Sequence, residues 1–129
     1  MAFKQIDIAL TVTARAAREA REALKSLRAL LSPDTFEDLR LLVSELVANS
    51  ARHAGELGHR GYVRVKVFAS ERLVRVEVSD EGPGFDKSAL RDPSPDDPSG
   101  RGLYLVDRLA KSWGVTGDGE TCVWFVLAA

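Results

Sequence analysis

Residues 73–84 read LVRVEVSDEGPG, and this stretch decides the fold. Valine occupies every second position from 74 to 78, and the positions between carry the charged residues Arg75 and Glu77. This alternation predicts a β-strand with one packed face and one wetter face. Strands of this kind are typical of antiparallel sheets. The strand is expected to end at Asp80, and Gly82 and Gly84 then allow the backbone to turn tightly and to approach a ligand closely.

Three further segments extend the predicted sheet. Residues 62–68, YVRVKVF, alternate in the same way, and Ser70-Glu71-Arg72 is predicted to form the turn between the two strands. The stretch from Phe3 to Val12 mixes apolar and polar residues and is expected to form an edge strand. A closing hairpin is predicted from Trp113 to Leu127, with its turn at Gly117-Asp118-Gly119.

Two helices are predicted between the first strand and this pair. Thr13 is expected to be the N-cap of the first, because its hydroxyl can accept a hydrogen bond from a first-turn amide. Residues 14–31 follow it with an apolar side and a charged side. Asp34 is predicted to cap the second helix, which runs to about Ala54 and stops at Gly55.

The order of these segments predicts an α+β fold. A third helix is expected from Gly102 to Lys111, after a proline-rich and aspartate-rich loop over residues 86–99. Helices come first and a mainly antiparallel sheet follows, which favours a two-layer α/β sandwich. We expect a mainly antiparallel mixed sheet, covered on one face by about three helices, in a single domain spanning residues 1–129.

Composition narrows the possible functions. The net charge of -1 argues against a dedicated nucleic-acid binder, so no direct nucleic-acid contact is expected. The chain has no apolar run of roughly 18–20 residues, so no membrane partner is expected. A single cysteine, Cys122, excludes an intrachain disulfide and fits a reducing, cytoplasmic location. With only His53 and His59 beside it, a zinc cage is not expected.

A polar strip follows one side of the second predicted helix. Glu45, Asn49 and His53 are spaced i, i+4, i+8, so they lie within about 80° of arc. The strip borders an apolar stripe formed by Leu39, Leu42, Val43, Leu46 and Val47. A carboxylate and an amide at such a border are partly buried and cost free energy unless a partner satisfies them. The strip is therefore either a binding face or an ordinary solvated helix edge.

Two glycine-containing segments could face a ligand. A carboxylate at a strand end, such as Asp80, can accept a hydrogen bond from an exocyclic amine like that of adenine, although Asp-x-Gly-x-Gly also forms simple turns. Ser99-Gly100-Arg101-Gly102-Leu103 opens the third helix, where exposed amides, the helix dipole and Arg101 would attract an anion. The same glycines could instead merely end the flexible loop.

Together and in this order, the three elements resemble the Bergerat-fold (GHKL) ATPases, the superfamily that includes gyrase and the histidine kinases. The likeness runs through Glu45–Ala54 (ELVANSARHA, the N box), Asp80–Gly84 (DEGPG, the first glycine box) and Gly100–Leu103 (GRGL, the second). Within this group the chain is most similar to the anti-sigma-factor serine/threonine kinases of bacterial partner-switching systems and their short stand-alone relatives. The resemblance extends from about Ala14 to Leu127.

The resemblance implies a role for each matching residue of the helix strip and strand end. Asn49 would ligate a Mg²⁺ ion that bridges the phosphates of ATP, because Mg²⁺ prefers oxygen ligands. Glu45 would be the catalytic base that receives or orients the proton of the attacking hydroxyl. Asp80 would bind the adenine amino group. His53 would either touch the phosphates or pack at the helix end.

The other matching residues would complete the nucleotide site. Gly82 and Gly84 would admit the adenine, and Thr121 on the final hairpin would support it through its hydroxyl or a water. The phosphates would be cradled by Gly100, Arg101, Gly102 and Leu103. Residues 85–99 would form a lid.

The resemblance leads to two hypotheses for function. The first is an ATP- and Mg²⁺-dependent protein serine/threonine kinase that phosphorylates a small anti-sigma-factor antagonist and can also sequester a sigma factor. The second is a non-catalytic, nucleotide-gated module that captures a regulator. No helical region carries a phosphoacceptor histidine, which excludes a complete histidine kinase but leaves a detached catalytic fragment as an alternative.

Three other features have plainer interpretations. A basic stripe on the first helix could receive an acidic partner, but it is interrupted by glutamates and also fits a solvated face. Trp113 and Trp124 are expected to belong to the core, and Cys122 is expected to be inert. The related kinases often form homodimers, and a homodimer is a possible assembly of this chain as well.

Overall fold

The computed structural model describes residues 3–56, 61–80, 101–116 and 121–128. The strands are β1 (Phe3–Thr11), β2 (Tyr62–Ser70), β3 (Leu73–Asp80), β4 (Ser112–Thr116) and β5 (Thr121–Ala128). The helices are α1 (Ala16–Leu24), the short 3₁₀ helix η1 (Lys25–Leu27), α2 (Pro33–Glu56) and α4 (Arg101–Leu109).

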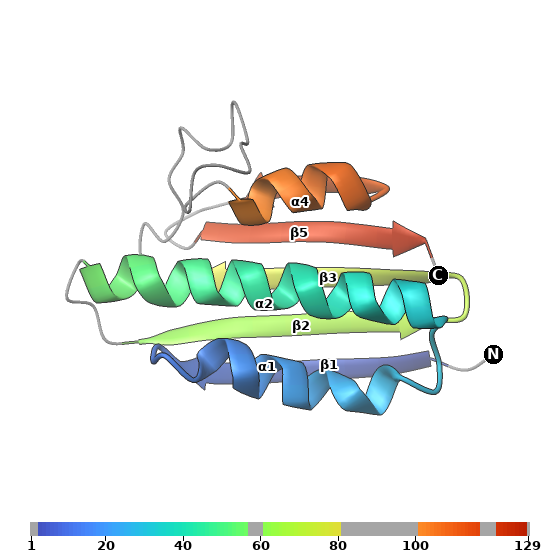
Figure 1. Ribbon diagram of the computed structural model, residues 1–129, viewed down its shortest axis with the longest axis horizontal. Helices are drawn as coiled ribbons and strands as arrows, with labels where there is room; N and C mark the ends of the chain where they lie inside the picture. Colours follow the sequence, from blue (N-terminus) through green and yellow to red (C-terminus); the bar gives the residue numbers. More distant parts are fainter. Residues whose placement is uncertain (1–2, 57–60, 81–100, 117–120, 129) are drawn as a thin grey trace.

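The strands form one five-stranded sheet in the order β1-β2-β3-β5-β4 (Figure 1). Each pairing between described strands is antiparallel, so the predicted antiparallel character is confirmed, and no parallel pair of a mixed sheet occurs among them. β1 is an edge strand, as expected. The closing hairpin places β5 inside the sheet, where it pairs with β3, and leaves β4 at the other edge.

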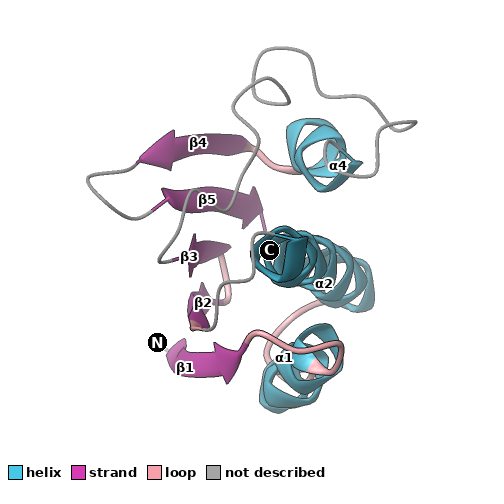
Figure 2. Cartoon of the chain, turned by 90° about the vertical axis from the view of Figure 1, so that its left-hand side faces the viewer, coloured by secondary structure: helices cyan, strands magenta, loops and turns pink. Residues whose placement is uncertain are grey.

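The helices α1, α2 and α4 all cover the same face of the sheet, which confirms the two-layer α+β prediction (Figure 2). The valines of β2 and β3 that alternate in the sequence point toward the helices and are fully buried. The apolar stripe of α2 meets them from the other side, and all five of its predicted residues have no exposed surface. Burying each such side chain contributes about 1.5–3 kcal/mol, so this interface stabilises the fold strongly.

The opposite face of the sheet is not covered by any described helix. Arg64 of β2 donates two hydrogen bonds of 2.9 Å to the carboxylate of Asp7 on β1, which ties the edge strand to the sheet. Trp124 lies on this face, because its neighbours Val123 and Phe125 point into the core. The prediction of a core position is therefore wrong for Trp124. It is half-buried by Arg75, whose guanidinium lies 4.9 Å from the ring centroid.

Trp113 fits its predicted place better, because it packs against the core from β4. The neighbouring residue, Gly114, faces the other way and supports Trp124. A Cβ atom on Gly114 would lie 2.8 Å from Nε1 of the indole, which is closer than such atoms approach. Glycine at this position therefore allows the ring to lie flat on the backbone of β4.

The start and end of α1 differ from the prediction. The Thr13 hydroxyl accepts a hydrogen bond from the backbone N–H of Arg15 at 3.1 Å, as a cap would, but the helix begins only at Ala16. It ends at Leu24 rather than Leu31 and continues as η1. A 3₁₀ turn places residues i and i+3 above one another, so Leu24 and Leu27 both remain buried.

Both ends of α2 also differ. Ser32 is the N-cap in place of Asp34, because its Oγ accepts from the N–H of Thr35 at 3.2 Å and its carbonyl accepts from Phe36 at 2.9 Å. Pro33 then occupies the first helical position, which suits its fixed φ angle. At the other end the helix passes through Gly55 and ends at Glu56, because glycine weakens a helix without necessarily ending it.

Candidate functional site

The middle of α2 presents the predicted polar strip at the edge of the core. Glu45 is half-buried, and Asn49 is only 5% exposed. Their neighbours Leu46 and Val47 have no exposed surface, since they face the sheet. The partial burial predicted for the carboxylate and the amide is therefore confirmed. Two strong hydrogen-bonding groups are held at the border between core and solvent.

Asn49 has a neighbour that the sequence reasoning missed. Nη2 of Arg52 donates a hydrogen bond to Oδ1 of Asn49. The two residues are three apart on α2, a spacing that brings side chains together on one helix face. The sequence signal that could have predicted this contact was a basic residue three positions after the asparagine. The contact places a guanidinium group beside the side-chain oxygen that we predicted as a metal ligand.

The start of α4 packs against this part of α2 through Gly102. A Cβ atom on Gly102 would lie 3.4 Å from Cδ2 of Leu46 and 3.6 Å from Cβ of Glu45. These are ordinary contact distances, so the backbone of the first turn of α4 lies close to the polar strip. The second glycine-containing segment and the strip therefore meet, as a common site requires.

The rest of α4 is anchored away from the strip. The side chain of Leu103 is fully buried in the core, so only its backbone could contribute to a phosphate cradle. Near the other end of the helix, Nε1 of Trp113 on β4 donates a hydrogen bond of 2.9 Å to Oδ1 of Asp107. These contacts hold α4 in place against the core and β4. The backbone of its first turn lies beside Glu45.

Asp80 and Thr121 form the other side of the site. They are directly paired across β3 and β5. Val78 lies two residues before Asp80 on β3, and Val123 lies two residues after Thr121 on β5; both valines are buried. Because alternate residues of a strand share a face, Asp80 and Thr121 continue these inward-facing rows. Asp80 is 5% exposed and Thr121 is half-buried. A carboxylate and a hydroxyl thus lie side by side on the face of the sheet that carries the helices.

The two sides converge at one end of the molecule. In Figure 1 the C-terminal half of α2, the end of β3, the first turn of α4 and the start of β5 lie toward the same end. α2 contacts α4, β3 and β5, so these elements are neighbours in space as well as in the view. The structure therefore brings Glu45, Asn49, Gly102, Asp80 and Thr121 to one region.

A buried hydroxyl in this region also indicates a ligand or ordered water. Ser50 has no exposed surface, and its Oγ has no hydrogen-bond partner among the described residues. Leaving such a group unsatisfied costs about 1–3 kcal/mol, so most buried hydroxyls bond to protein, water or ligand. Ser50 follows Asn49 on α2 and precedes the last turns of the helix.

Several predicted residues lie outside the described part of the chain. These are Gly82, Gly84 and Gly100, the lid over residues 85–99, and the turn at Gly117-Asp118-Gly119. The backbones of His53 and Arg101 belong to α2 and α4, but their side chains are not described. The roles expected for all of these remain predictions.

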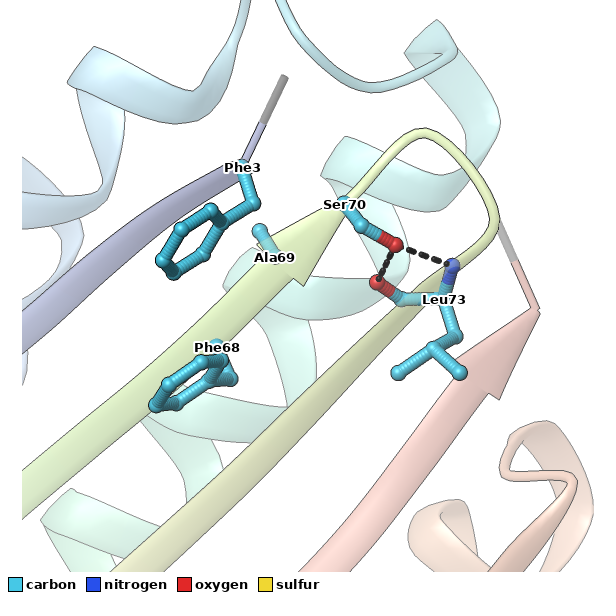
Figure 3. A pocket seen from close by; sticks show the side chains of 5 residues that line it. All are labelled: Phe3, Phe68, Ala69, Ser70 and Leu73. Carbon is cyan, nitrogen blue, oxygen red and sulfur yellow. Dashed lines mark hydrogen bonds between the residues drawn. The ribbon is translucent and has the colours of Figure 1, made fainter. Parts of the chain in front are cut away.

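An apolar hollow lies at the far end of the sheet and does not belong to this site (Figure 3). It is lined by Phe3, Phe68, Ala69, Ser70 and Leu73. The hydroxyl of Ser70 is engaged in the turn, where Oγ accepts a hydrogen bond from the N–H of Leu73 at 3.2 Å. The described lining residues carry no charge, which does not favour a nucleotide here.

Membrane spans and metal clusters are both absent from the described residues. None of the described helices is both long enough and apolar enough to cross a membrane. Within the same residues, histidine, cysteine, aspartate and glutamate do not gather in groups of three or more that could hold a metal ion.

Comparisons with known proteins point to one family. A family model for the histidine kinase-like ATPase domain matches residues 10–127. A protein named serine-protein kinase RsbW from Listeria monocytogenes serovar 1/2a is 33% identical over 92 residues, which cover 64% of this chain and 59% of the relative. A protein of the same name from Bacillus subtilis is 35% identical over 86 residues, covering 59% and 54%. The chain spans a little over half the length of these relatives.

Proposed function

This chain belongs to the histidine kinase-like ATPase domain family, and on that premise we propose that it is an ATP-dependent protein serine/threonine kinase. The observation that carries the proposal is the meeting of Glu45, on α2, with the first turn of α4 at Gly102. A glutamate beside the start of a helix supports phosphoryl transfer, because that reaction depends on positioning and on a nearby base. We also propose that residues 1–129 act as one ATP-binding domain.

The adenine of ATP fits the pair formed by Asp80 and Thr121. The Asp80 carboxylate can accept a hydrogen bond from the exocyclic amine, and the Thr121 hydroxyl lies directly across the strand pair. The buried Oγ of Ser50 offers a further polar group nearby. One carboxylate and two hydroxyls at this end of the core support recognition of a base that donates hydrogen bonds.

The phosphates would lie between α2 and the first turn of α4. The backbone amides at the start of a helix attract anions, and Arg101 adds a positive charge there. The side-chain oxygen of Asn49 suits a Mg²⁺ ion bound mainly by phosphate oxygens and water. When bound, Mg²⁺ would neutralise part of the charge on the phosphates.

The chemical role of Glu45 follows from this placement. The hydroxyl oxygen of a substrate serine or threonine forms a bond to the γ-phosphorus of ATP, and the bond from that phosphorus to the bridging β-γ oxygen breaks. ADP leaves with the electron pair of the broken bond. The carboxylate of Glu45 receives or orients the hydroxyl proton. Its half-buried position leaves it accessible to a protein substrate.

The protein substrate we propose is a small anti-sigma-factor antagonist, and sequestration of a sigma factor is a second proposed activity. Support comes from the likeness to proteins named serine-protein kinase and from the motifs that resemble anti-sigma-factor kinases. Since the chain covers only part of those relatives, their partners are carried over as a proposal.

A phosphotransfer assay tests the proposal. The purified chain is incubated with Mg²⁺, labelled ATP and each antagonist-like protein encoded beside it, and the products are analysed for phosphoserine and phosphothreonine. Glu45→Gln should abolish transfer while ATP still binds. Glu37→Gln, on the exposed side of the same helix, should retain transfer.

The outcomes separate the two hypotheses for function. A chain that binds ATP but transfers no phosphate to any co-encoded antagonist would overturn the kinase proposal. Partner capture that depends on ATP and survives Glu45→Gln would instead identify a nucleotide-gated binding module. A chain that does not bind ATP would overturn both.

A further inference from the structure

Arg52 and Asn49 form a contact whose chemistry conflicts with metal binding. Nη2 of Arg52 donates to Oδ1 of Asn49, the oxygen proposed as the Mg²⁺ ligand. Asn49 is only 5% exposed, so this oxygen has little access to bulk water. A guanidinium group and a magnesium ion are both cations, and bound to the two lone pairs of this one oxygen they would lie next to each other.

Occupation of one oxygen by two cations is unfavourable. Guanidinium does not lose its proton in proteins, so the conflict cannot be relieved by neutralising Arg52. Like charges at contact distance repel, and the repulsion is stronger at a partly buried site than in water. This repulsion favours the arrangement in which only one of the two cations is bound to the Asn49 oxygen.

We propose that Arg52 is a positioning residue that holds the Asn49 oxygen until Mg²⁺ arrives with ATP and displaces it. Arg52 then sets how strongly ATP binding depends on the metal. The proposed role rests on the proposed ATP site, and it gives Arg52, a residue of the N box, a competition with the metal that the resemblance does not imply.

The competition has a measurable consequence. Without Mg²⁺, ATP carries its full negative charge, and the guanidinium beside Asn49 is a source of positive charge close to the phosphates. With Mg²⁺, the metal supplies that charge and must overcome Arg52 to reach Asn49. Removing Arg52 therefore weakens binding of metal-free ATP and leaves Mg-ATP binding unchanged or stronger. The ratio of the metal-free to the Mg²⁺ dissociation constant therefore rises.

The experiment is a calorimetric titration of ATP into the protein, once in excess EDTA and once in excess Mg²⁺. For Arg52→Ala we expect the ratio of the metal-free to the Mg²⁺ dissociation constant to rise by about tenfold, the effect of roughly one charge-assisted hydrogen bond. Arg52→Lys retains a positive charge and should lie between the wild-type chain and Arg52→Ala. Arg52→Gln keeps a donor for Asn49 without charge and should behave like Arg52→Ala, so it serves if the alanine variant fails to fold.

A matched control is present on the same helix. Arg40 also reaches a residue three positions earlier, contacting Glu37 at 3.1 Å, but it lies near the opposite end of α2. Arg40→Ala should leave the ratio within about twofold of the wild-type value, since it is remote from the site.

The results distinguish this inference from the proposed function. If the wild-type chain binds ATP and the ratio in Arg52→Gln and Arg52→Ala stays within about twofold of wild type, Arg52 does not compete with the metal and the inference is wrong. Equal weakening with and without Mg²⁺ leaves the ratio unchanged and contradicts the inference in the same way. If the wild-type chain binds no ATP under either condition, the proposed function itself fails.

Discussion

Gly102 of α4 lies directly against Glu45 of α2, and a Cβ atom added to Gly102 would be 3.6 Å from Cβ of the glutamate. That distance is an ordinary contact, so one extra carbon fits and a larger side chain does not. The absence of a large side chain at position 102 therefore allows the first turn of α4 to lie beside Glu45.

A size series at Gly102 tests this packing. Gly102→Ala should keep the free energy of unfolding or raise it by up to about 1 kcal/mol, because alanine favours the helix. Gly102→Leu should lower it by about 1–3 kcal/mol and weaken ATP binding, since the side chain must push α4 away from Leu46. Urea denaturation and calorimetry measure the two effects. Equal stability of the leucine and alanine variants would contradict the packing.

Base recognition by Asp80 is tested with two nucleotides. Inosine triphosphate carries a carbonyl oxygen where ATP carries the amine, so the wild-type chain should prefer ATP. Asp80→Asn should reduce this preference by about 10- to 100-fold, the range for a hydrogen bond to a charged group, because an amide can donate as well as accept. Competition binding measures both ligands.

The control for that experiment is Glu77→Gln on the same strand. Glu77 points to the uncovered face of the sheet, opposite to Asp80. Its variant should keep the preference for ATP. A preference that survives Asp80→Asn would show that the base is recognised elsewhere.

Ser50→Ala should have opposite effects on stability and binding. Without nucleotide, removal of a buried hydroxyl that has no partner among the described residues should raise the free energy of unfolding by about 1 kcal/mol. ATP affinity should fall, because the ligand or its water loses a partner. Thermal unfolding and calorimetry test the two parts.

Ser44→Ala is the comparison for Ser50→Ala. The Oγ of Ser44 donates to the carbonyl of Arg40, so its removal should not stabilise the chain. If both variants change stability alike, the hydroxyl of Ser50 is satisfied in solution and the prediction is wrong.

Asp38 provides a pH-dependent prediction. Burial, followed by the nearby charge of Asp34, raises the pKa of Asp38 above its ordinary value of 3.8. The folded chain therefore holds this proton at pH values where the unfolded chain has lost it, and stability falls as pH rises through that interval. The free-energy cost of ionising Asp38 in the folded chain is fully present at neutral pH.

Asp38→Asn removes this cost. The free energy of unfolding at pH 7 should rise, with relief of the repulsion from Asp34, one helical turn away, contributing about 0.2–0.5 kcal/mol. Well below pH 3.8 the wild-type residue is protonated in both the folded and the unfolded chain, so the gain should vanish. Urea denaturation at the two pH values measures the difference. A gain that is independent of pH would show that the carboxylate charge is not its cause.

Local patterns explain why much of the fold was predictable. The alternating valines of residues 62–68 and 73–78 predicted two half-buried strands, and their register confirms the packed face. The apolar stripe of α2 was equally clear, because helical spacing alone decides which side chains share a face. The helix boundaries were less certain, because Ser32 and Asp34 are both good capping residues and only the observed bond to Thr35 chooses between them.

Contacts between distant residues were not predictable in the same way. The position of Trp124 depends on which face of β5 meets the helices, and an indole suits either face. The contact between Arg52 and Asn49 depends on the side-chain geometry at one point of α2. A sequence pattern contains the spacing of two residues, but not the orientation that burial imposes on their side chains.

For the candidate site, the linear order of residues was sufficient to select Glu45, Asn49, Asp80 and the Gly100–Leu103 segment, because each residue type and spacing has a recognisable chemistry. The meeting of these segments depends on the tertiary structure. β5 must pair with β3 for Thr121 to lie opposite Asp80, and α4 must pack on α2 for Gly102 to reach Glu45. Both contacts join residues far apart in the chain, and burial of the shared core is what brings them together.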